Sequence, residues 1–138
     1  MSELDIQSIV SDIYAEGDID LLFFGFITGY VSYDADDNSY DKSNWQVFED
    51  TVKLIEYLIT TGDFVVGRMY ATDDGVEFVA YANGFTEFES VARQYMCEAG
   101  LRCDALSWEL ALCKVHIGKA ASAVPELVGK LLRPSTSS

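Results

Sequence analysis

The first 41 residues of the chain contain no lysine or arginine. They carry ten acidic side chains, and the first basic residue is Lys42. Over all 138 residues, 23 Asp and Glu oppose 9 Lys and Arg, which gives a formal charge of −14. Such a field repels nucleic-acid phosphates and anionic lipids but attracts basic proteins. The sequence therefore argues against nucleic-acid and membrane partners and favours a basic protein partner.

Cysteine and histidine are scarce. The Cys113-x-x-His116 spacing suits two ligands on one helix face, but the gaps to Cys97 and Cys103 match no common zinc pattern. His116 is the only histidine, and no Gly-x-Ser-x-Gly elbow or cysteine-protease motif accompanies it. We expect buried structural thiols, no metal, no cofactor and no enzymatic activity. The absence of a signal-peptide pattern in residues 1–11 favours a reducing cytoplasm.

Long apolar runs are also missing. The longest, residues 19–31, includes Asp20 and two glycines, so it is too short and too polar to span a bilayer. The 49% of residues that are hydrophobic are enough to build the core of one small domain. We expect a single domain over residues 1–133 and a disordered serine-rich tail at 134–138.

An acidic loop holds the start of a calcium-binding pattern. Asp34, Asp36 and Asn38 occupy positions 1, 3 and 5 of an EF-hand loop. Position 6 is Ser39 instead of glycine and position 12 is Trp45 instead of glutamate, which argues against an EF-hand. A solvated acidic loop, a weaker cation site and a protein-binding loop remain as interpretations.

Apolar spacing, capping boxes and turn residues together indicate an α+β fold that is mainly α. We predict about five to six helices and one small antiparallel hairpin between the third and fourth helices. The predicted hairpin strands are about 64–71 and 76–81, joined by Asp73-Asp74-Gly75. The predicted helices lie at about 3–15, 19–30, 44–61, 86–99, 104–117 and 124–132.

One stretch has the order of elements found in a known class of proteins. A helix ends in the sequence of residues 54–64, a strand with Val66-Gly67 and the hairpin follow, and a helix opens at Thr86. Together with Trp108, this order resembles small bacterial immunity proteins, the inhibitors of polymorphic or contact-dependent toxins. The resemblance covers residues 43–108. It implies a small cytoplasmic protein that blocks a toxin, often a basic nuclease, and it assigns a role to no particular residue.

Charge and resemblance together predict an immunity protein that neutralises a basic toxin domain by tight binding. An acidic adaptor or regulatory subunit is the second hypothesis, and a small-ligand-binding protein or enzyme is the third. Acids flanked by tyrosines suit an interface, because tyrosine is a common interface anchor. The predicted contact residues are Tyr33, Asp34, Asp36, Asp37, Tyr40 and Asp41 on the loop, followed by Asp73, Asp74 and Glu77 on the hairpin.

Overall fold

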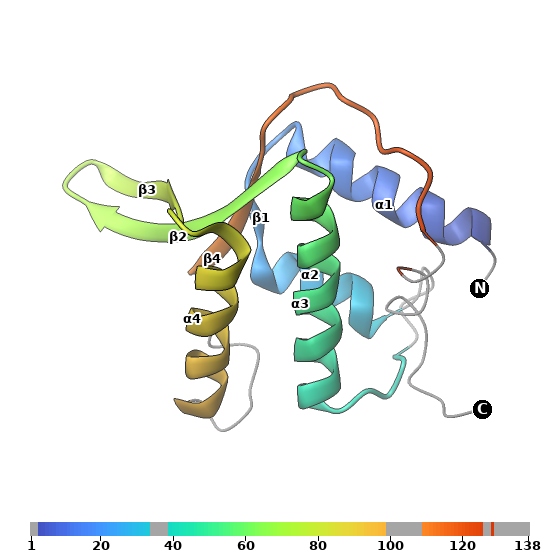
Figure 1. Ribbon diagram of the computed structural model, residues 1–138, viewed down its shortest axis with the longest axis horizontal. Helices are drawn as coiled ribbons and strands as arrows, with labels where there is room; N and C mark the ends of the chain where they lie inside the picture. The colour runs from blue at the N-terminus through green and yellow to red at the C-terminus, as the bar shows by residue number, and fades with distance from the viewer. Residues whose placement is uncertain (1–2, 34–38, 99–108, 126–127, 129–138) are drawn as a thin grey trace.

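The computed structural model describes residues 3–33, 39–98, 109–125 and 128. These residues form four helices and one four-stranded antiparallel sheet with strand order β1-β4-β2-β3 (Figure 1). The elements in chain order are α1 (Glu3–Gly17), β1 (Leu22–Phe23), α2 (Phe24–Ser32), α3 (Asn44–Thr60), β2 (Phe64–Thr72), β3 (Gly75–Ala80), α4 (Gly84–Glu98) and β4 (Leu110–Lys114).

The predicted fold class is therefore wrong. The hairpin of β2 and β3 does lie between α3 and α4, but it forms only half of a larger sheet. The other half comes from β1 and β4, which lie in segments predicted to be helical. The described residues contain four helices instead of five to six.

The predicted helix at 104–117 is replaced by β4 over its described part. Leu110–Lys114 pairs with Phe64–Arg68 of β2 on one side, and Leu112 and Ala111 pair with β1 on the other. A short apolar segment has no strong preference between helix and strand, so the open edge of β2 decides its conformation.

The predicted helix at 19–30 begins later than expected. Asp18 and Ile19 end α1 in a turn, and Leu22–Phe23 forms β1 before α2 starts at Phe24. The pairing of Leu22 with Leu112 and of Phe23 with Ala111 holds these residues in the sheet. A helix through residue 22 would break both pairs.

The third helix agrees most closely with its prediction. The Ser43 hydroxyl accepts a hydrogen bond from the Gln46 backbone N–H at 3.1 Å, which caps the first turn. Phe48, Val52 and Ile55 are buried along one side of α3, as their spacing indicates.

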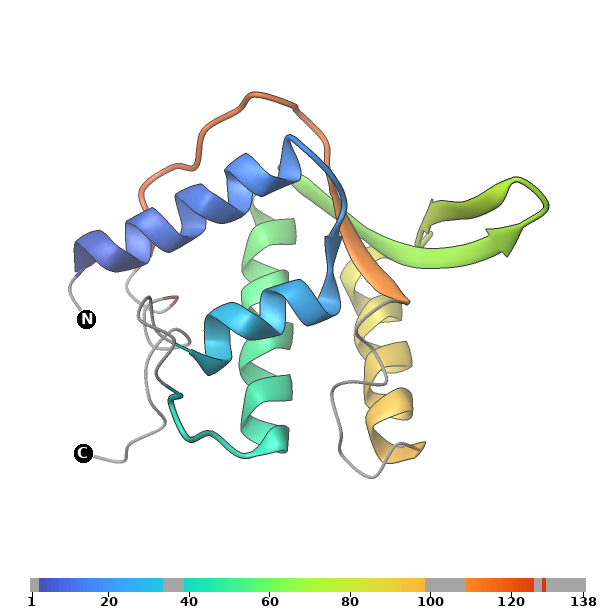
Figure 2. The same cartoon turned by 180° about the vertical axis from the view of Figure 1, so that it is seen from behind.

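All four helices lie on one side of the sheet, and the hairpin of β2 and β3 projects beyond them (Figures 1 and 2). The rings of Phe24, Phe48 and Phe88 meet between α2, α3 and α4, with centroid separations of 6.3 Å from Phe24 to each of the others. The sheet contributes buried side chains to this core: Leu22, Phe64, Val66, Leu110 and Leu112.

A buried lysine fixes α1 to β4. The Lys114 ammonium donates to the Tyr14 carbonyl at 3.1 Å, to the Asp18 carboxylate at 2.6 Å and to the Lys119 carbonyl at 2.7 Å. All three of its donors are thus satisfied, so this charge can stay in the protein interior without a large penalty. Hydrogen bonding to the Gly118 N–H and to Lys114 keeps the pKa of Asp18 below its usual value.

Candidate protein-interaction surface

The side of the sheet that faces away from the helices is apolar. Phe64 and Val66 point into the core, so strand alternation turns Val65, Gly67 and Met69 to the opposite side. Residues that pair across antiparallel strands share a face. The register of the described strands therefore defines an open face that contains no charged side chain: Phe23, Val65, Gly67, Met69, Ala71, Val76, Phe78, Ala80, Ala111 and Cys113.

Much of this open face is accessible. Val76 is 70% exposed and Val65 is 39% exposed, while Met69 and Phe78 are partly buried. Phe78 lies over Gly67, where a Cβ in place of the glycine hydrogen would stand 2.8 Å from its ring. An antiparallel sheet with one solvated face normally carries polar residues there. A contiguous apolar face is instead typical of a surface that contacts another molecule.

Acidic side chains stand at two borders of the open face. Asp73, Asp74 and Glu77 lie exposed at the tip of the hairpin, and Glu16 and Asp20 lie near β1. We call these five residues the acidic rim. None of the five forms an ion pair with a described residue.

Most described bases are paired elsewhere in the molecule. Arg93 contacts Glu49 at 2.5 Å and Glu89 at 2.8 Å on the helical side. Among the described residues, the further ion pairs are Lys42–Asp50, Arg68–Glu109, Lys114–Asp18 and Lys119–Asp63. The bases therefore neutralise acids within the fold, and the acidic rim keeps its charge.

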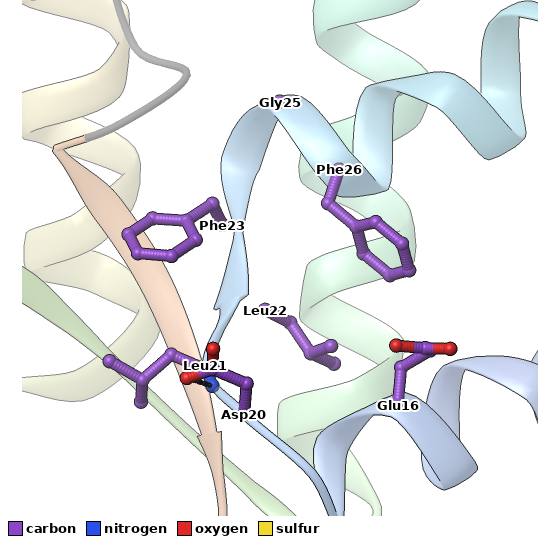
Figure 3. A pocket seen from close by; sticks show the side chains of 7 residues that line it. All are labelled: Glu16, Asp20, Leu21, Leu22, Phe23, Gly25 and Phe26. Atoms are coloured by element: carbon purple, nitrogen blue, oxygen red, sulfur yellow. Dashed lines mark hydrogen bonds between the residues drawn. The ribbon is translucent and has the colours of Figure 1, made fainter.

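A pocket of about 540 Å³ adjoins the open face through Phe23 (Figure 3). Its apolar wall includes Leu22 and Phe26, and the carboxylate-bearing side chains of Glu16 and Asp20 stand beside it. The combination of apolar wall and carboxylates suits a long basic side chain, whose stem is apolar and whose end is cationic.

The predicted contact residues are distributed over two separate regions. Asp34, Asp36 and Asp37 lie outside the described residues. Tyr33 is half exposed, and Asp41 is exposed with a left-handed backbone, φ 57°. The Tyr40 side chain is only 7% exposed and contacts Lys42, so it offers a partner little area.

The hairpin acids Asp73, Asp74 and Glu77 are all exposed and border the open face. The apolar residues between them and β1 were not among the predicted contact residues. The sequence did contain one indication of this apolar face, because β2 begins with Phe64-Val65-Val66, in which apolar and polar residues do not alternate. Such a run is typical of a strand that is covered on both sides.

The thiols and the histidine do not come together as a site. Cys97 is exposed at the end of α4, so the prediction that it is a buried thiol is wrong, while Cys113 is partly buried on the open face. His116 is exposed beyond β4, and Cys103 lies outside the described residues. In the part of the chain that the structure describes, no three His, Cys, Asp or Glu residues are grouped to hold a metal ion.

No described helix has the length and apolar character needed to cross a bilayer.

Comparison with protein-family models, with curated protein sequences and with solved structures finds no significant match to this chain.

Proposed function

We propose that this protein acts by binding a basic protein partner on its open face, and that the partner is a toxin domain which it neutralises. The observation that carries the proposal is an outward sheet face without charges on a chain of charge −14. Protein interfaces combine an apolar, desolvated centre with a polar border. The open face and the acidic rim have this arrangement.

The charge distribution supports a basic partner in particular. The acidic rim has no described base to neutralise it, so lysines and arginines of a partner would gain new ion pairs there. Charge attraction of this kind speeds association, which benefits an inhibitor that has to capture a toxin quickly. The nature of the partner as a toxin rests on the resemblance of residues 43–108 to immunity proteins, and a cytoplasmic location follows from that proposal.

The test is co-expression with the protein encoded immediately upstream of this chain. A stoichiometric complex, together with death of host cells when this chain is withheld, is the expected result. A stable complex without toxicity would favour the second candidate, an adaptor or regulatory subunit, because the same surface serves either role. No complex and no toxicity would refute the proposal.

A matched pair of variants locates the surface. Val65→Lys places a positive charge on the open face, while Ser90→Lys adds the same charge at an exposed position on α4. We expect Val65→Lys to abolish protection and complex formation, because an unpaired charge is costly in a desolvated interface. Ser90→Lys should protect like the wild type. Equal protection by both variants would exclude the open face.

A further inference from the structure

The strand β3 lies at the edge of the sheet, and its outer side is available for another strand. It pairs only with β2 among the described strands. The hairpin projects beyond the four described helices, so none of them shields this edge (Figures 1 and 2). Natural proteins usually shorten, cover or twist such an edge because its free backbone groups bind other strands.

The register identifies which backbone groups of β3 are free. The Tyr81 N–H donates to the Val66 carbonyl at 3.0 Å, and the Met69 N–H donates to the Glu109 carbonyl at 2.8 Å. The backbone N–H and C=O groups of even-numbered β2 residues thus form hydrogen bonds with β3, and those of odd-numbered β2 residues form hydrogen bonds with β4. In an antiparallel ladder the direction alternates at each residue. The N–H and C=O groups of Val76, Phe78 and Ala80 therefore point away from β2.

These three residues also carry side chains on the open face. A strand added beside them would extend the sheet and enlarge the open face at the same time. Every second side chain of the added strand would point to the other face of the sheet, the face that carries Glu77, near the acidic tip of the hairpin. Lysine or arginine at these alternate positions would compensate the charge of Glu77, Asp73 and Asp74.

We propose that β3 receives an extended, basic segment of the partner as a fifth strand of the sheet. This inference rests on the proposed function and specifies how the partner binds. A second copy of this chain is a poor occupant, because each copy has charge −14. Pairing β3 with itself would also bring the acids of two hairpin tips onto one extended sheet, where like charges repel.

The first experiment uses a synthetic peptide of roughly ten residues in which lysine and valine alternate, which is the length of a long strand. We expect binding to the full-length protein and slower hydrogen exchange at the amides of Val76, Phe78 and Ala80, by about tenfold or more. The comparison peptide is N-methylated at every second residue, so that it keeps the charge but cannot pair. Equal binding of both peptides would overturn strand addition.

A backbone variant supplies the second test. Ala80→Pro removes an N–H that the hairpin does not use, and proline is tolerated on edge strands. Ala80→Ser is the matched control that keeps the N–H. We expect Ala80→Pro to retain the wild-type circular dichroism and melting temperature but to bind the peptide at least about tenfold more weakly than Ala80→Ser.

The same variants separate this inference from the proposed function. If the toxin complex tolerates Ala80→Pro but is lost in Val65→Lys, the partner binds the open face without strand addition, and only the inference fails. If the complex tolerates both substitutions, the inference and the open-face surface fail together. Loss of the complex in both variants, with Ala80→Ser and Ser90→Lys unaffected, supports both.

Discussion

Two exposed valines on β3 allow the contribution of the open face to partner binding to be measured. Val76 lies on the open face and is 70% exposed, while Val79 lies on the opposite face and is 45% exposed. Full burial of a valine side chain contributes about 1.5–3 kcal/mol. A partner that covers the exposed part of Val76 would therefore gain about 1–2 kcal/mol of binding free energy.

The substitutions Val76→Ser and Val79→Ser make the same chemical change on the same strand. We expect Val76→Ser to raise the dissociation constant of the complex with the proposed basic partner about 5- to 30-fold, whereas Val79→Ser should change it less than about 2-fold. Val79 is the more buried of the two in the free protein, so Val79→Ser should lower the melting temperature at least as much as Val76→Ser, although it should affect binding less. Isothermal titration calorimetry measures the affinities. Equal losses, or a greater loss for Val79→Ser, would refute the assignment of the open face.

Three further outcomes follow from particular contacts. Glu16→Lys and Asp20→Lys at the pocket should slow association with a basic partner several-fold at low salt, and stopped-flow rates at high salt should converge with the wild type. Gly67→Ala should destabilise the protein by about 1–3 kcal/mol or more in thermal unfolding, because its Cβ would stand 2.2 Å from the Val79 carbonyl oxygen. Gly29→Ala is the control in α2, where no atom of a described residue lies within 4 Å of the added Cβ, and it should stabilise the helix slightly. Asp63→Asn should cost about 1–3 kcal/mol in urea unfolding at neutral pH, with the difference shrinking in acid.

The acid dependence of Asp63 follows from its contacts. Its carboxylate accepts hydrogen bonds from the Lys119 ammonium at 2.5 Å and from the Tyr14 hydroxyl at 2.6 Å, and both keep its pKa below the usual value. A carboxylate whose pKa falls on folding stabilises the protein above its unfolded pKa. That stabilisation is lost as the pH drops through the folded pKa. Burial and the bond to Asp63 raise the pKa of Tyr14 to about 12, so Tyr14 stays neutral throughout this range.

Local signals were sufficient for the middle of the chain. The Ser43 cap and the apolar stripe predicted α3, and Asp73-Asp74-Gly75 between two apolar segments predicted the hairpin. Each signal acts over a few residues, so the rest of the fold has little influence on it. Within the stripe, Phe48, Val52 and Ile55 are buried, whereas Trp45 in the first turn is 42% exposed.

The elements of the fold that the sequence did not predict depend on pairing between segments that are far apart in the chain. Residues 110–114 are separated from their β2 partners by more than forty positions, and from β1 by about ninety. Their apolar pattern suits a helix equally well until those partners are present. The open face could not be predicted for the same reason, because Ala111 and Cys113 join it only once β4 enters the sheet. The exposed acids of the hairpin were among the predicted contact residues, while the apolar surface between them and β1 was not.

Under the proposed function, the surplus of acids and the open face together would let the chain bind a partner without binding a second copy of itself. Two apolar sheet faces attract each other through the hydrophobic effect, which is independent of the sequence of the partner. The acidic rim makes that attraction selective. Two copies would bring like charges together around the interface, whereas a basic partner would bring opposite charges together. Lys114 and Lys119 pair with Asp18 and Asp63, so neither base neutralises an acid of the rim.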